Sequence, residues 1–194
     1  MAKSKGLHFY KKEKKLNKSV IRTIGTYIFL VAISFLLAGV IVYCVGIKTS
    51  VIGNSMEPTL SSGEEILINR VKYTFSKPKR YDVIVFLPNG NTKTHYYVKR
   101  VVGLPGEKIQ IVDGKIYVND TVLKDAVYFD KIAESGIASL SFTLGKDEYF
   151  VLGDNVNSSE DSRSANIGNV KFEDILGKAW FRFGTETTDM GLID

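Results

Sequence analysis

The sequence has little of the two residue types on which many metal and catalytic sites depend. Its 194 residues include one cysteine, Cys44, and two histidines, His8 and His95. One cysteine cannot form a disulfide within the chain, so a disulfide-stapled fold is excluded. Neither an H-E-x-x-H nor a C-x-x-C motif is present, so we expect no zinc site and no other cofactor. With 44% hydrophobic and 24% charged residues, the composition also excludes a disordered or collagen-like chain.

Acidic residues are scarce at the N-terminus, where the basic residues gather. Residues 1–22 hold eight Lys/Arg and one acid, which leaves 18 basic and 20 acidic residues after Arg22. The formal net charge of +5 therefore belongs to the N-terminal tail, and the rest of the chain sums to −2. A nucleic-acid-binding domain, which needs a basic face, is not expected.

Charged residues and histidine are absent from residues 23–47. These residues would extend about 38 Å as a helix, enough to cross a hydrocarbon core of about 30 Å with some tilt. A cleaved signal peptide is the nearest alternative, but its apolar region is usually only about 7–15 residues long. A buried core helix is the other alternative. We predict one uncleaved transmembrane helix over 23–47.

The charges that flank this segment predict its orientation. Basic residues precede it, and only Lys48 follows closely. Residues 1–22 should therefore form a cytoplasmic tail, and residues 48–194 should be exported across the plasma membrane. Cys44, near the outer end of the apolar run, is either a small packing residue or, less simply, a lipidation site.

After residue 48 short β-rich runs alternate with turn signals, which predicts a mostly β domain with one core. Asp113-Gly114 joins two of these runs as a type I′ hairpin turn would. Residues 124–147 are less regular and should leave the main sheet. The predicted strands are Glu65–Arg70, Asp82–Leu87, Tyr96–Val102, Lys108–Val112, Lys115–Val118, Tyr149–Leu152 and Lys178–Phe183.

Few nucleophiles and bases remain for catalysis in the exported part. Cys44 lies in the predicted membrane segment, and His8 lies on its cytoplasmic side. A Ser-His-Asp triad would have only His95 to use. The main enzymatic option is therefore a hydroxyl nucleophile activated by a base other than histidine.

Ser55 is the first candidate for that nucleophile. It lies in the segment Gly53-Asn54-Ser55-Met56-Glu57-Pro58-Thr59-Leu60, a few residues after the predicted membrane helix. Gly53 allows a close approach of the backbone, and Pro58 stiffens the turn. Met56 offers an apolar side chain for lipid or substrate. The same segment also fits an ordinary loop next to the membrane.

Lys99 is the candidate base. It lies in a predicted strand whose alternation places His95, Tyr97, Lys99 and Val101 on one face. Burial on that face would lower the pKa of the ammonium from its usual value of about 10.4. The alternative is a lysine that reaches solvent at a sheet edge. Arg100 should point to the opposite face and pair with an acid such as Asp82 or Asp161.

A third polar segment, residues 153–163, follows the apolar strand Tyr149–Leu152. Its acids, amides and hydroxyls predict a hydrogen-bonded loop, in which an Asp161–Arg163 pair would brace a neighbouring strand. Ser159 is a candidate to hydrogen-bond the amine of Lys99 and orient it. The acidic spacing does not fit an EF-hand calcium loop.

Together these segments resemble the type I signal peptidases. Four motifs occur in order: Ser-Met-x-Pro-Thr-Leu at 55–60, Tyr-Asp-Val-Ile-Val-Phe at 81–86, Lys-Arg-Val-Val-Gly-Leu-Pro-Gly at 99–106, and Gly-Asp-Asn…Asp-Ser-Arg at 153–163. The single anchor and the small size are similar to the shorter, Gram-positive-type enzymes. The resemblance implies a partly barrel-like β catalytic domain with a smaller β excursion at about 106–146.

The resemblance also implies the roles of individual residues. Ser55 would attack the scissile carbonyl, neutral Lys99 would act as general base, and the Ser55 N–H would help to form the oxyanion hole. Some relatives have a serine at the position of Gly53, which leaves the second oxyanion donor of this chain open. Ser159, Asp161 and Arg163 match positions that support the lysine and the sheet. Val156 departs from the arginine often found after Gly-Asp-Asn.

The activity that the resemblance implies is removal of signal peptides from exported preproteins at the plasma membrane. Such substrates carry small residues one and three positions before the cut, so shallow apolar pockets are expected. The partners would be preproteins and the lipid bilayer, without nucleic acid. Two alternatives stay open at this point: a non-catalytic membrane-anchored module that binds exported proteins, and a Ser-His-Asp hydrolase that uses His95.

Overall fold

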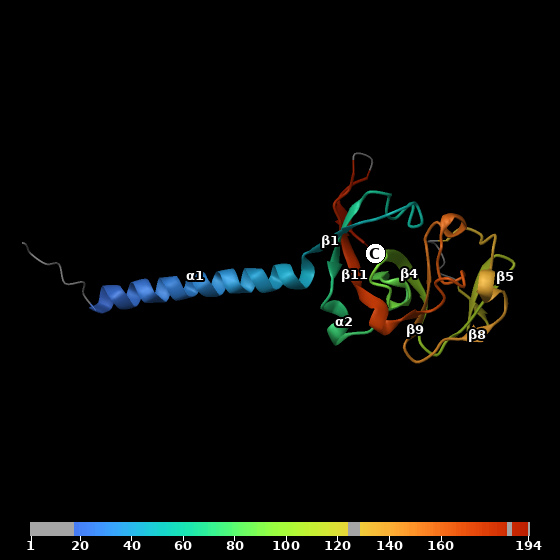
Figure 1. The fold of residues 1–194 in the computed structure, drawn as a ribbon, viewed down its shortest axis with the longest axis horizontal. Coiled ribbons are helices and arrows are strands. Elements are labelled where there is room, and N and C mark those ends of the chain that lie inside the picture. The colour runs from blue at the N-terminus through green and yellow to red at the C-terminus, as the bar shows by residue number, and fades with distance from the viewer. Residues whose placement is uncertain (1–17, 124–128, 186–187, 194) are drawn as a thin grey trace, which may run out of the picture. The chain divides into compact units, whose positions relative to one another are not determined.

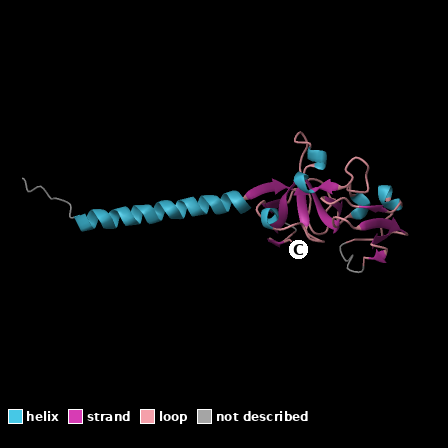
Figure 2. Cartoon of the chain, turned by 90° about the horizontal axis from the view of Figure 1, so that it is seen from below, coloured by secondary structure: helices cyan, strands magenta, loops and turns pink. Residues whose placement is uncertain are grey.

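The protein is mostly β, with one long apolar helix at its N-terminal end (Figure 1; Figure 2). The structure, a computed structural model, describes residues 18–123, 129–185 and 188–193. The chain divides into two compact units, residues 1–40 and 41–194. The mostly β fold with an N-terminal helix is as predicted. The basic tail is described only from Lys18 onward, so most of its predicted features, with His8, lie outside the described residues.

Helix α1 (Lys18–Val45) contains most of the uncharged run. Its segment Lys18–Tyr43 is long and apolar enough to cross a membrane, by length and composition alone, and none of it is buried within the protein. Three hydroxyls in it, on Thr23, Thr26 and Ser34, donate to carbonyls four residues back, so these polar groups are satisfied inside the helix. The helix starts five residues before the predicted segment and ends two residues before its predicted end.

The main sheet of the second unit is antiparallel and has the strand order β1-β2-β11-β3-β4-β9-β10, with β12 paired to β11. A smaller antiparallel sheet has the order β7-β6-β5-β8. The strands are β1 (Ile47–Ser50), β2 (Glu65–Asn69), β3 (Val83–Phe86), β4 (Tyr97–Gly103), β5 (Lys108–Val112), β6 (Lys115–Val118), β7 (Thr121–Val122), β8 (Phe142–Thr143), β9 (Glu148–Leu152), β10 (Val170–Lys171), β11 (Ile175–Arg182) and β12 (Gly191–Leu192).

Short helical turns connect these strands. They are α2 (Lys72–Phe75), η1 (Pro88–Gly90), η2 (Gly136–Ser139), η3 (Val156–Ser158) and η4 (Phe172–Asp174). The smaller sheet lies within the predicted excursion. Its β5–β6 hairpin turns at Asp113 and Gly114, whose φ angles of 52° and 76° are both positive. Both central residues of a type I′ turn need positive φ, so the hairpin prediction is confirmed.

Strands β3 and β4 lie in the middle of the main sheet and are covered on both faces. Val83 and Val85 pack into one buried cluster with Val98, whereas Ile84 and Val101 belong to another. This burial explains the near-continuous apolar runs Val83–Phe86 and Val98–Val102. The alternation also places Lys99 on the face of Tyr97 and Val101, as predicted.

Strand β1 was not predicted, because Ile47 and its neighbours continue the apolar run of the helix. Gly46 ends the helix, and Ile47–Ser50 then pair with β2 in register Ile47↔Ile68. The chain therefore turns back into the sheet immediately before the loop that holds Ser55. This pairing fixes where that loop begins.

Candidate active site

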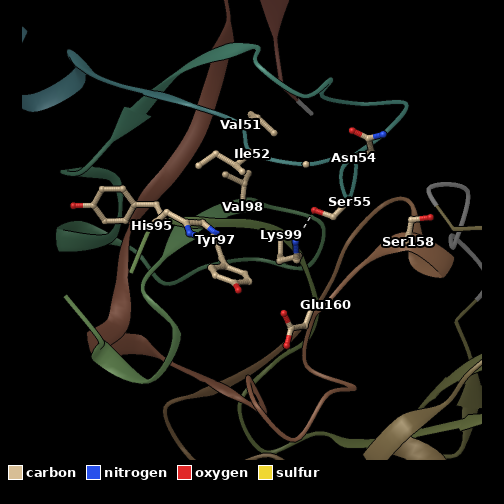
Figure 3. A pocket seen from close by; sticks show the side chains of 12 residues that line it. Val51, Ile52, Asn54, Ser55, His95, Tyr97, Val98, Lys99, Ser158 and Glu160 are labelled. Carbon is tan, nitrogen blue, oxygen red and sulfur yellow. Dashed lines mark hydrogen bonds between the residues drawn. The ribbon is translucent and has the colours of Figure 1, made fainter. Parts of the chain in front are cut away.

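Ser55 and Lys99, 44 residues apart, are in direct contact. The Lys99 Nζ donates a hydrogen bond to the Ser55 Oγ at 2.6 Å, as Figure 3 shows. Ser55 comes from the loop after β1, and Lys99 from the centre of β4. A hydroxyl in contact with a lysine amine is the arrangement needed for a nucleophile and its general base.

Lys99 is 4% exposed, and this burial lowers the pKa of its ammonium to about 8, because the charged form loses its hydration. The carboxylates of Asp161, Glu160 and Asp154 act in the opposite direction and hold part of the charge in place. The Nζ also lies 5.5 Å from the ring centre of Tyr97. A substantial neutral fraction of Lys99 is therefore present near pH 8.

The Ser55–Lys99 pair opens into a pocket of about 190 Å³. Ile52, Tyr97 and Val98 give part of its wall an apolar character (Figure 3). His95 also lines it and stacks on Tyr97, with ring centres 5.0 Å apart and planes within 9°. No hydrogen bond joins His95 to Ser55 in the part of the chain that the structure describes. The side-chain nitrogen in contact with the serine is therefore that of Lys99.

The Ser55 loop is held by buried side chains and by the segment after β9. Met56 and Leu60 are fully buried in the core, so the expectation that Met56 meets lipid or substrate is wrong. The Ser55 carbonyl accepts the N–H of Asn155 at 3.1 Å. A side chain at Gly153 would collide with that carbonyl, so the close approach of the two segments requires glycine there.

The N–H groups of Gly53 and Ser55 are the two candidate donors to an oxyanion, and they differ in their hydrogen bonds. Gly53 has φ of 79°, and its N–H donates to the Ser62 Oγ at 3.2 Å. The Ser55 N–H has no acceptor within the described ranges. A Cβ added at Gly53 would meet nothing within 4 Å, so the space that a relative's serine would fill is open here.

Asp161 and Arg163 form the predicted pair. The Arg163 Nε lies 2.8 Å from the Asp161 Oδ1, and its Nη2 lies 2.9 Å from the Oδ2. The same Nη2 donates to the carbonyl of Val156, whose own side chain is buried. The Arg163 guanidinium therefore stabilises the loop through the backbone carbonyl of Val156, the position at which the sequence departs from the expected arginine.

Ser159 behaves differently from the expectation. Its Oγ is buried and has no hydrogen-bond partner among the described residues, so the expected bond to Lys99 is absent. The hydroxyl instead lies close to Gly153, where an added Cβ would collide with it. It is therefore next to the Ser55 backbone, but does not orient the lysine in this structure.

Arg100 pairs with neither of the acids named from the sequence. It is fully buried and binds Asp154 through two hydrogen bonds, each of 2.8 Å. Asp82 instead binds Lys178 at 2.7 Å, and Asp161 binds Arg163. Asp154 follows β9, which pairs with β4 in register Arg100↔Leu152, so its position depends on strand pairing that is invisible in the local sequence.

The described residues contain no group of three or more His, Cys, Asp or Glu side chains that could hold a metal ion. What the site offers is a hydroxyl, a buried amine and an adjoining pocket. That combination suits acyl transfer through a serine.

Comparison with known proteins identifies the family of the chain. A family model described as signal peptidase, peptidase S26, matches residues 22–184. A signal peptidase I of Bacillus caldolyticus is 39% identical over 142 residues, which cover 68% of this chain and 75% of that protein. A probable signal peptidase I-2 of Synechocystis is 33% identical over 153 residues, or 74% and 68% of the two chains. A crystal structure of a signal peptidase I from Enterococcus faecalis aligns with 53% of this chain and 97% of that chain, at 30% identity and a TM-score of 0.42.

Proposed function

The chain belongs to the peptidase S26 family of signal peptidases, and we propose that it removes signal peptides from exported preproteins with Ser55 as nucleophile and Lys99 as general base. The observation that carries this proposal is the 2.6 Å contact between the Lys99 Nζ and the Ser55 Oγ. Membership of the family supports the peptidase activity. The contact and the burial of Lys99 support the assignment of the two roles.

In the first step, neutral Lys99 takes the proton of the Ser55 hydroxyl while the oxygen attacks the scissile carbonyl. The carbonyl carbon becomes tetrahedral, and its oxygen takes the negative charge. Lys99 then gives the proton to the leaving nitrogen, and the bond between the carbonyl carbon and that nitrogen breaks. The mature protein leaves with a free amino group, and the signal peptide stays on Ser55 as an ester.

In the second step, Lys99 takes a proton from a water molecule, whose oxygen attacks the ester carbonyl. Lys99 then gives this proton to the Ser55 Oγ as the bond between that oxygen and the carbonyl carbon breaks, and the signal peptide leaves with a free carboxyl group. In both steps the Ser55 N–H donates to the oxyanion. The Gly53 N–H is a second donor only if it exchanges its bond to Ser62 for one to substrate. The hydrogen bond from the Asn155 N–H to the Ser55 carbonyl and the Asp161–Arg163 ion pair help to keep the loop of Ser55 next to β4, which carries Lys99.

The apolar wall of the pocket suits small side chains before the cut. Ile52, Tyr97 and Val98 line it, and every substrate side chain that enters shares its volume of about 190 Å³, which favours small side chains. An extended peptide that pairs with a strand sends alternate side chains to the same face, so the first and third residues before the cut would share this wall.

We further propose that the apolar helix α1 anchors the enzyme, with the basic residues before it in the cytoplasm and the β domain, which begins at Ile47, outside. The basic residues before the apolar helix and the length of that helix support this topology. Ser55 then lies only ten residues beyond Val45, the last residue of the helix. This short spacing suits a cut close to the outer surface of the membrane, where a signal peptide leaves the bilayer.

The pH dependence of cleavage tests the role of Lys99. Its pKa is lowered to about 8, and only the neutral amine accepts the serine proton. We expect kcat/KM to rise with pH through a midpoint near 8 and to fall about tenfold for each pH unit below it. The measurement is cleavage of a signal-peptide substrate by the full chain in detergent between pH 6 and 10.

A His95→Gln variant is the matched control, because His95 lines the same pocket. It should keep the wild-type midpoint. A midpoint near 6.5 in the wild type that disappears in the His95 variant would assign the base to the histidine instead.

A further inference from the structure

A second groove adjoins the active-site pocket and shares two residues with it. It lies between residues 133–136 and 156–164 and has a volume of about 640 Å³, which is within the roughly 300–1,000 Å³ usual for ligand pockets. Ser158 and Glu160 line both this polar groove and the pocket of Ser55 and Lys99. The two hollows therefore adjoin at Ser158 and Glu160.

The groove lies on the side from which the leaving part of a substrate would emerge. In Figure 3, His95 and Tyr97 lie on one side of the Ser55–Lys99 pair, and Ser158 lies on the other. Under the proposed function, the small residues before the cut occupy the apolar wall beside Tyr97. Because the bond to be cut lies at the Ser55 Oγ, the residues after it pass toward Ser158.

Hydrogen bonds between side chains and backbone groups connect the two walls of the groove. The Arg163 Nη1 donates to the Glu134 carbonyl at 3.1 Å, and its Nη2 donates to carbonyls in the opposite wall. Asn157 accepts the N–H of Ala133 at 3.0 Å. The groove therefore keeps its shape without a ligand, which lowers the entropic cost of ordering it on binding.

The groove carries an excess of negative charge. Among the described residues that line it, Arg163 is the one cation, and Asp161 neutralises that charge through hydrogen bonds of 2.8 and 2.9 Å. Two lining carboxylates remain, those of Glu134 and Glu160. Both residues are exposed, and Glu160 accepts from the neutral amide of Asn166 at 3.4 Å. A cationic side chain is the complementary ligand.

We infer that the polar groove binds the first residues of the mature protein after the cut, and that Glu134 and Glu160 favour a lysine or arginine there. This inference rests on the proposed function. It adds a specificity determinant on the leaving side of the scissile bond, and one of its walls comes from the excursion outside the main sheet.

A competing path passes Glu57 and Asp130, which line a hollow of about 470 Å³ with Asn155. That hollow is also acidic. It shares no lining residue with the active-site pocket, whereas the polar groove shares two. Continuity therefore favours the groove, and the two paths predict different charge-reversal results.

The test uses the full chain in detergent and one preprotein substrate that carries lysine or glutamate in turn at each of the first four positions after the cut. We expect the wild type to prefer lysine over glutamate by about three- to tenfold in kcat/KM at the most sensitive position at low ionic strength. The preference should shrink toward one at high salt, because the carboxylates are exposed. Glu134→Lys should reverse it.

Two charge reversals are matched controls. Glu57→Lys probes the competing path, and Glu173→Lys adds the same charge at a distant exposed site; both should keep the wild-type preference. A wild-type ratio near one at all four positions overturns the inference, as does a reversal by Glu57→Lys but not by Glu134→Lys. In either case Ser55-dependent cleavage of both substrates continues, so the proposed function survives; loss of cleavage by the wild type would overturn that function instead.

Discussion

Replacement of Lys99 by methionine is expected to lower kcat/KM for a signal-peptide substrate by on the order of 10³–10⁴-fold, the range that a general base contributes. Methionine is close to lysine in length, so it can fill the buried space beside Tyr97. Because Lys99 is 4% exposed and its amine is costly to charge there, removal of the amine should leave the fold intact or slightly more stable. The measurement is initial cleavage rate, with circular dichroism to compare the folded state.

The control for this variant is Lys115→Met, which changes an exposed lysine in strand β6. It should cleave at the wild-type rate. If the folded Lys99→Met protein retained more than about a tenth of wild-type activity, the role of general base would have to pass to another group.

Removal of the Asp154 side chain is expected to destabilise the protein strongly. Arg100 and Asp154 are both fully shielded from solvent in their side chains and bind each other at 2.8 Å. In Asp154→Ala the guanidinium would stay buried without its carboxylate, which typically costs about 3–5 kcal/mol. We expect a matching fall in the free energy of unfolding, measured by urea denaturation of the full chain in detergent.

A matched pair at the surface separates this effect from a general loss of charge. The Lys171 Nζ lies 3.7 Å from the Glu173 Oε1, and both side chains are largely exposed. Glu173→Ala should therefore change the free energy of unfolding by less than about 1 kcal/mol. Equal losses in the two variants would contradict the structural role given to the Arg100–Asp154 pair.

The parts of the fold that depend on local sequence could be predicted. The uncharged run gave the long helix, and Asp113-Gly114 gave the hairpin turn. Alternation in one strand placed Lys99 on the face of Tyr97 and Val101. Each of these features follows from residues within a few positions of one another, where propensity and periodicity apply directly.

The parts of the structure that depend on pairing between distant segments could not be predicted from the sequence. Asp154 reaches Arg100 because β9 pairs with β4, and nothing near either residue distinguishes Asp154 from Asp82 or Asp161 as a partner. Strand β1 was hidden because its first residue extends the apolar run of the helix. The bond expected between Ser159 and Lys99 rests on the residue types of segment 153–163 alone, which do not define the path of the loop; the residues after η3 leave the Ser159 hydroxyl beside Gly153 instead.

The Ser55–Lys99 pair could be predicted only in part. The sequence supplied both residues and a reason for each, but not their separation. The antiparallel pairing of the central strands and the contact between the Ser55 carbonyl and the Asn155 N–H bring the two side chains to 2.6 Å. The resemblance to the family made the pair the leading hypothesis, and the packing explains how this chain assembles it.

The most direct test of the proposed mechanism is cleavage of a purified preprotein by the wild type and by Ser55→Ala, with the product identified from its new N-terminus. Ser61→Ala, six residues away in the same loop and outside the pocket, is the matched control. We expect the wild type and the Ser61 variant to release the mature protein at one bond, and the folded Ser55 variant to release none. Release of the same product by Ser55→Ala would contradict the assignment of Ser55 as the nucleophile.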